Sequence, residues 1–168
     1  MTAAGALLAL LALVEAPSPA QRAAAELQGL PRCAAAPAPA PKDWKRVPVR
    51  DGFSIALSAC FAPAAEQPRF MHGGMVWLCN QPSVTVSNVT VSWGMWSQSS
   101  FTDPDKRCAA TIGGLPALVM TSPDETRIWY LTGTVHEPVV SVWNKTPAEL
   151  ERIQPVAWSG VLEAPAAK

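Results

Sequence analysis

The sequence predicts an α+β fold, a mainly antiparallel β-sheet of about six to eight strands with a C-terminal helix. The first observation is the stretch Ser83–Trp96, which alternates apolar and polar residues with the period of a half-buried strand. The second is a series of short apolar runs, separated by turn residues, throughout the chain after residue 43. The third is that the clearest helix start, at Thr146, comes only after these runs.

Composition excludes some classes of partner. The chain has 168 residues, enough for one domain with appendages, and 49% of them are apolar. Lys plus Arg equals Asp plus Glu, at 13 each, and neither sign forms a run. Since nucleic-acid binders and proteins of anionic membrane surfaces carry basic patches, we expect neither kind of partner. Six of the 17 prolines lie within residues 17–41 and all seven tryptophans follow residue 43, which divides the chain there.

Residues 1–20 have features of a secretory signal peptide. Ala3–Val14 is uncharged and apolar but too short to span a bilayer as a helix, which takes about 20 residues. Ser18–Ala20 offers small residues for cleavage, and Val14–Ala16 is an alternative cleavage site. No basic residue precedes the apolar run, which indicates either a start further upstream or an atypical signal. The competing interpretation of the run is a buried Ala/Leu helix. We predict a secreted or periplasmic protein without a stable membrane anchor after cleavage.

Residues 21–42 are expected to form an Ala/Pro-rich spacer before the folded domain, residues 43–163. Gln21–Gln28 is long enough for two helical turns. Residues 37–41 then alternate Pro and Ala, a pattern typical of extended, polyproline-like chain. We expect no packed structure in this segment.

The folded domain begins with two short strands, Trp44–Arg50 and Phe53–Leu57, joined by the hairpin signal Asp51-Gly52. Pro48 places the first strand at a sheet edge, because proline has no amide hydrogen to donate. Alternating or apolar runs predict the remaining strands: Phe70–Cys79, Ser83–Trp96, Cys108–Ile112, Leu115–Thr121, Thr126–Thr132 and Pro138–Trp143.

The central strand, Ser83–Trp96, is expected to have one apolar and one polar side. Its Val and Trp side chains face a core, while Thr and Ser meet water. The alternation changes phase at Ser87-Asn88, which predicts a β-bulge there.

The predicted C-terminal helix begins with a capping box at Thr146–Glu149, with Pro147 at the first helical position. Pro155 is expected to end or kink this helix. Val156–Leu162 is either a last helical piece or a closing strand.

Three short patterns carry a family resemblance. They are the opening Arg46–Val49 with Phe53–Leu57, the hairpin Ile112–Ala117 and the C-terminal helix. Together they resemble the Mog1/PsbP-like superfamily of small α+β domains over roughly Asp43–Leu162. The resemblance implies an antiparallel sheet flanked by helices, and an exported or accessory binding role without catalysis. It carries no functional residue over to this chain.

The four cysteines are expected to form two disulfides, because an even count in an exported chain favours pairing. If the strands form a simple meander, Cys60 and Cys108 lie at one end of the sheet and Cys79 at the other. We therefore predict that Cys60 pairs with Cys108 and that Cys33 pairs with Cys79. The alternative is four buried or unpaired thiols.

Sequence motifs indicate no catalytic, metal-binding or cofactor-binding site. His72 and His136 stand apart, and neither has a matched partner for catalysis or for a metal. The acidic pairs fall in turn signatures or at the helix start, where carboxylates cap backbone groups.

Tryptophan is the enriched residue type, and an exposed indole can stack on sugars or anchor a protein. The candidate binding residues are Trp77, Trp93, Trp96 and His72. We predict an exported, non-catalytic binding or accessory domain of the cell envelope, whose partner is an envelope protein or a glycan. One alternative is a carbohydrate-binding module that uses an exposed tryptophan. Another is a small envelope hydrolase that uses His72 or His136 with a carboxylate.

Overall fold

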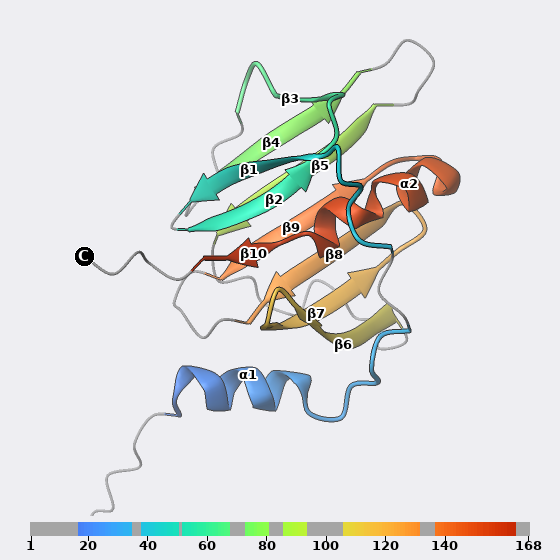
Figure 1. Ribbon diagram of the computed structural model, residues 1–168. Coiled ribbons are helices and arrows are strands. Elements are labelled where there is room, and N and C mark those ends of the chain that lie inside the picture. Colours follow the sequence, from blue (N-terminus) through green and yellow to red (C-terminus); the bar gives the residue numbers. More distant parts are fainter. Residues whose placement is uncertain are drawn as a thin grey trace, which may run out of the picture.

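A seven-stranded and a three-stranded antiparallel sheet lie one over the other in the computed structural model (Figure 1). The structure describes residues 17–34, 38–50, 52–67, 73–80, 86–93, 106–131 and 137–163. The order of strands in the large sheet is β3-β4-β5-β9-β8-β7-β6, and in the small sheet it is β1-β2-β10.

The described residues form two helices and ten strands. The helices are α1 (Pro19–Leu27) and α2 (Pro147–Trp158). The strands of the large sheet are β3 (Phe61–Pro63), β4 (Gly74–Cys79), β5 (Ser87–Trp93), β6 (Arg107–Ile112), β7 (Leu115–Thr121), β8 (Glu125–Tyr130) and β9 (Pro138–Trp143). Those of the small sheet are β1 (Lys45–Arg50), β2 (Phe53–Leu57) and β10 (Val161–Leu162).

The mainly antiparallel strand pairing and the C-terminal helix are confirmed, but the strands form two sheets rather than one, and the small helix content means that the fold fits the α+β class only loosely. The strand count exceeds the expected six to eight because β3 and β10 are only three and two residues long. Such short pairs carry no alternation that sequence analysis can detect. Val156–Trp158 are the last residues of α2, and Val161–Leu162 form β10, which pairs with β2, so the last apolar run is partly a helical piece and partly a closing strand.

The main core lies between the large sheet and the layer formed by α2 and the small sheet. We call the side of the large sheet that meets this layer the inner face, and the opposite side the outer face. The inner face contributes side chains that are at most 1% exposed: Val89, Val91, Val119, Ile128, Val140 and Val142. From the other layer come Phe53, Ile55 and Leu57 of β2 and Leu150, Ile153, Val156 and Ala157 of α2.

Part of the outer face is covered by α1. A second apolar cluster there joins α1 to the large sheet: Ala23, Leu118, Met120, Trp129, Leu131 and Val139. Leu27 and Leu30 pack against its edge. Figure 1 shows α1 beside the end of the sheet formed by β6 and β7.

The segment after α1 is fixed to the edge strand β6. The Ala109 amide donates to the Pro31 carbonyl at 2.8 Å, and the Cys33 amide donates to the Ala109 carbonyl at 3.0 Å. Cys33 is also bonded to Cys108. The expectation of no packed structure in residues 21–42 is therefore wrong for the first part of that range.

Helix α1 begins inside the stretch assigned to the signal peptide. The side chains of Ser18 and Gln21 cap it reciprocally, with the Ser18 hydroxyl accepting from the Gln21 amide at 3.2 Å. The Gln21 side chain accepts from the Ser18 amide at 2.6 Å. Cleavage after Ala20 would remove this cap, so the two assignments compete for the same residues.

All four cysteines are paired, as expected, but the predicted pairing is wrong. The disulfides join Cys33 to Cys108 and Cys60 to Cys79. The prediction assumed a meander without β3. In the structure, β3 pairs with β4 so that Phe61 lies opposite Cys79, which brings the Cα atoms of Cys60 and Cys79 to 5.0 Å.

Both predicted hairpins form. Gly52, in the β1–β2 turn, has a φ of 78°, and Gly113 and Gly114, between β6 and β7, have φ values of 57° and 81°. These left-handed conformations are strained for residues with a Cβ atom, so glycine suits the turns. Asp51 lies outside the described residues.

The start of α2 differs from the predicted capping box. The Thr146 side chain makes no capping hydrogen bond, and instead the Thr146 amide donates to Asn144 Oδ1 at 2.7 Å. Asn144 is buried, and its side-chain nitrogen Nδ2 also donates to Ser87 Oγ at 2.8 Å. The helix runs through Pro155 to Trp158 rather than ending at the proline.

The predicted bulge at Ser87-Asn88 is absent from the described part of β5. Strand β5 pairs residue by residue with β4, from Cys79 opposite Ser87 onward. Val86 lies just before the strand and is 45% exposed. The change of phase in the sequence therefore marks the beginning of the strand.

Candidate binding surface on the outer face

The predicted binding tryptophans are in the core where the structure describes them. Trp77 is 2% exposed and Trp93 is 5% exposed, and both belong to the inner-face cluster. Trp77 lies opposite Val89 and so shares its side of the sheet, and the guanidinium of Arg50 lies 5.6 Å from the Trp93 ring centroid. These positions correct the expectation that Trp77 or Trp93 lies at a binding surface. Trp96, His72 and His136 lie outside the described residues.

A different tryptophan stands apart from both apolar clusters. Among the described residues, Trp44, Trp143 and Trp158 are half-buried. Trp44 and Trp158 pack against the inner-face cluster, whereas Trp143 belongs to neither cluster. The indole of Trp143 therefore has a polar setting that needs a separate explanation.

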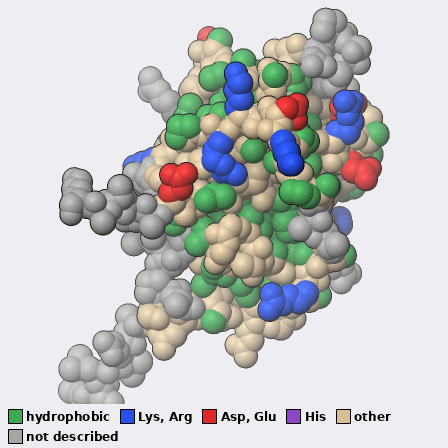
Figure 2. Space-filling model, viewed as in Figure 1, with side chains coloured by type: hydrophobic (Ala, Val, Ile, Leu, Met, Phe, Trp, Pro, Cys, Tyr) green, Lys and Arg blue, Asp and Glu red, His purple; other side chains and the backbone are tan. Residues whose placement is uncertain are grey.

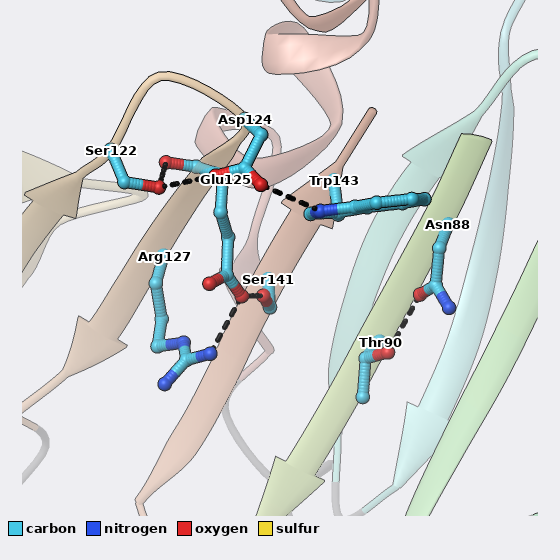
Figure 3. Close-up of polar contacts among 8 residues, drawn as sticks. All are labelled: Asn88, Thr90, Ser122, Asp124, Glu125, Arg127, Ser141 and Trp143. Atoms are coloured by element: carbon cyan, nitrogen blue, oxygen red, sulfur yellow. Dashed lines mark hydrogen bonds and ion pairs between the residues drawn. The ribbon is translucent and has the colours of Figure 1, made fainter. Parts of the chain in front are cut away.

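Trp143 lies within a polar region of the outer face, on the three neighbouring strands β5, β9 and β8. Pairing across these strands forms two rows of side chains. The first row is Asn88, Trp143 and Glu125, and the second is Thr90, Ser141 and Arg127. We call these six residues the polar patch; Figure 3 shows them together.

The polar patch follows from alternation in the strands. In β9, Ser141 and Trp143 alternate with Val140 and Val142, which are fully buried on the inner face. The same period leaves the Ser141 and Trp143 side chains half-buried on the outer face. The tryptophan that the sequence analysis passed over could thus have been found from its phase relative to Ser141.

Hydrogen bonds fix the charged end of the patch. Arg127 Nη2 lies 2.6 Å from Glu125 Oε1, and the Ser141 hydroxyl donates to the same carboxylate oxygen. The side chains of Arg127 and Glu125 are 18% and 22% exposed. On β5, Thr90 Oγ1 donates to Asn88 Oδ1 at 2.8 Å.

The indole of Trp143 is held by the turn before β8. Its Nε1 donates to Asp124 Oδ2 at 3.3 Å, and the Ser122 hydroxyl donates to Asp124 Oδ1 at 3.0 Å. These hydrogen bonds, from Ser122 first and then from Trp143, hold the pKa of the Asp124 carboxyl below its usual value. The carboxylate is therefore charged at neutral pH and fixes one edge of the indole.

Backbone contacts make the turn a firm support. The Ser122 amide donates to the Glu125 carbonyl at 2.7 Å, and the Asn144 amide donates to the Asp124 carbonyl at 3.0 Å. Because Asn144 is itself buried and bonded to Ser87, the turn is tied to the end of β5. The patch thus rests on ordered strands and a braced turn, which suits a preformed binding surface.

The opposite side of the molecule has a different character. Figure 2 shows Lys and Arg side chains interspersed with Asp and Glu on the face that carries α2 and the small sheet. Charges mixed in this way form no single-sign field that would attract a polyelectrolyte.

The chemistry available in the polar patch is hydrogen bonding and aromatic stacking. In the described ranges, no three His, Cys, Asp or Glu side chains are grouped so that they could hold a metal ion. No helix within the same ranges has the length and apolar character that crossing a membrane requires.

Comparison with known proteins adds no assignment. No family model matches the chain, and no curated protein matches it. The functional argument therefore depends on the geometry of the surface.

Proposed function

We propose that the protein is an exported, non-catalytic binding or accessory domain of the cell envelope, and that its partner contacts the polar patch. The observation that carries this proposal is the position of Trp143. Its large indole is half-buried among hydrogen-bonding side chains, although both apolar clusters of the fold lie elsewhere. A fixed aromatic side chain surrounded by polar groups is a common feature of binding surfaces.

Two further features support export. Disulfides persist mainly in oxidising compartments, and this chain has two of them. The uncharged apolar run Ala3–Val14 suits the central region of a signal peptide. The resemblance to the Mog1/PsbP-like superfamily favours the same accessory role.

The proposal is tested by site-specific photocross-linking in the native host. A benzophenone amino acid replaces Asn88, which lies beside Trp143 in the first row of the patch. The matched control replaces Glu151, an exposed residue of α2 on the other side of the large sheet.

We expect ultraviolet light to produce adducts from position 88 and few from position 151. Adducts of equal yield at both positions, or at position 151 alone, would contradict the assignment of the patch as the binding surface. Thermal melting of both variants is the control that each protein is folded.

A further inference from the structure

We infer that the polar patch binds a neutral oligosaccharide, with one pyranose ring stacked on the indole of Trp143 and its hydroxyl groups bonded to the neighbouring side chains. This inference depends on the proposed function, because it assigns a ligand to the surface proposed there. Four properties of the patch support it.

The first property is the orientation of the indole. Figure 3 views the ring of Trp143 nearly edge-on while the strands beneath it are seen broadly face-on. The ring therefore stands up from the sheet and reaches from β9 toward Asn88 on β5. The hydrogen bond to Asp124 holds it at one edge and leaves the aromatic faces for stacking. The apolar face of a pyranose ring is a suitable partner for such a surface.

The second property is the set of polar groups beside the indole. Hydroxyls of Thr90 and Ser141, the amide of Asn88, and the charged groups of Glu125 and Arg127 all lie on one face of the sheet. Neighbouring strands are about 4.8 Å apart, so these groups extend over about two strand spacings. That arrangement suits a ligand with several hydroxyl groups around its rim, each of which can donate and accept.

The third property is the charge of the patch. Glu125 and Arg127 form an ion pair, and Asp124 beside them adds one negative charge that Ser122 and Trp143 stabilise. A polyanion would gain no attraction here. Charged groups form stronger hydrogen bonds with hydroxyls than neutral groups do, which favours an uncharged polyol.

The fourth property distinguishes a glycan from a protein partner. The centre of a protein interface is usually rich in apolar side chains. Among the described residues, the exposed large hydrophobic side chains are Val86 and Leu162, and neither belongs to the polar patch. Apart from one indole, the patch consists of polar groups, so we favour the oligosaccharide.

The test is a titration of the ¹⁵N-labelled full chain with cellohexaose, followed through the indole N–H resonances of its seven tryptophans. Trp143→Phe identifies the resonance of interest by its disappearance. We expect that resonance to shift with saturation near 1 mM or below, about the range of weak glycan binding, while the resonances of the buried Trp77 and Trp93 stay in place.

Variants then test the mode of binding. Trp143→Ala is expected to weaken binding at least about tenfold, and Thr90→Val, which keeps the side-chain shape but removes a hydroxyl, a few-fold. Trp158→Phe is the matched control, because Trp158 packs against the inner-face cluster, and it should bind as the parent does. Because Thr90→Val removes one hydroxyl and keeps the shape of the side chain, we expect this variant to fold. Its affinity for the oligosaccharide therefore still tests the inference if Trp143→Ala fails to fold.

Three outcomes would overturn the inference. They are no shift with cellohexaose, chitohexaose, xylohexaose or maltohexaose; a shift with polygalacturonate alone; and unchanged binding by Trp143→Ala. If these titrations fail while position 88 still cross-links to an envelope protein, the proposed binding function stands and only the glycan is wrong. If position 88 also gives no adduct, both proposals fail.

Discussion

Breaking the Cys33–Cys108 disulfide should release the N-terminal segment from the edge of β6 and strongly lower the stability of the domain. The double replacement Cys33→Ala/Cys108→Ala removes the covalent bond and leaves small apolar side chains in place of the two half-buried cysteines. The two hydrogen bonds between Ala109 and the segment Pro31–Cys33 must then hold that segment unaided.

The size of the effect follows from the length of the loop that the bond closes. The two cysteines are 75 residues apart. Loop-closure entropy for that length corresponds to about 4 kcal/mol of stabilisation, which is at the upper end of the range usual for disulfides. For a chain of this size, such a loss lowers the melting temperature by roughly 8–16 °C.

Urea unfolding and native-state hydrogen exchange measure the two parts of the prediction. The free energy of unfolding should fall by about 4 kcal/mol. Exchange of the Ala109 amide, which donates to the Pro31 carbonyl at 2.8 Å, should accelerate more than exchange within β9. Cys60→Ala/Cys79→Ala is the control, since it removes the other disulfide and should leave Ala109 protected. A loss below about 1 kcal/mol with Ala109 still protected would refute the reasoning.

Three further predictions concern the core and the turn beside the patch. Tyr130→Phe should lower the free energy of unfolding by about 1–3 kcal/mol, because it leaves the buried Ala157 carbonyl without the hydroxyl that donates to it at 2.7 Å. Burial raises the Tyr130 pKa well above its usual range, so this hydroxyl stays protonated and able to donate. An unchanged free energy of unfolding in urea would contradict the stabilising role of this hydrogen bond. Gly160→Ala should lower the free energy of unfolding by more than Tyr130→Phe does, because the added Cβ atom would collide with the Tyr130 hydroxyl. Combining Gly160→Ala with Tyr130→Phe should recover part of that loss. Strictly additive losses in urea unfolding would show that the collision is relieved elsewhere. The Trp143 indole N–H resonance should titrate with a midpoint below the usual aspartate pKa of about 3.9, since its partner Asp124 has a lowered pKa. The stabilisation from that carboxylate is complete above the unfolded-state pKa and is lost as pH falls through the folded-state pKa. Asp124→Asn should abolish the titration, and a midpoint at or above the usual value would contradict the hydrogen-bonded geometry.

Alternation within strands made most of the fold predictable. Val89 and Val91 repeat with period two, and burial on one side of a sheet follows directly from that period. The turn glycines, such as Gly113 and Gly114, fixed the hairpins for an equally local reason. These features depend on residues close in sequence, so no knowledge of the tertiary fold was needed.

The disulfide pairing depended on contacts that no local pattern encodes. Cys60 is placed by β3, a strand of three residues, and Cys33 by the parallel bridge between its neighbour Arg32 and Ala109, which lie far apart in the sequence. Helix α1 is similar, because Ala23 and Leu27 pack against side chains of the large sheet that lie far away in the sequence. Tertiary contacts decide such segments.

The binding surface was predictable only in part. The phase of Trp143 relative to Ser141 predicts its side of the strand. The position of α1 decides which part of the outer face is covered and which part is left as the polar patch. The sequence predicted no packed structure for the segment that contains this helix. Trp77 and Trp93 were predicted as candidate binding residues, whereas the structure buries both.

The functional proposals all assume that the protein works in an oxidising compartment, and the most direct test is its mass when it is isolated from its own host. Cells are fractionated in the presence of N-ethylmaleimide, which blocks free thiols, and the unreduced protein is weighed and digested. The account predicts envelope or extracellular protein without maleimide adducts, and peptides that join Cys33 to Cys108 and Cys60 to Cys79. Cytosolic protein in which all four cysteines carry maleimide would contradict it.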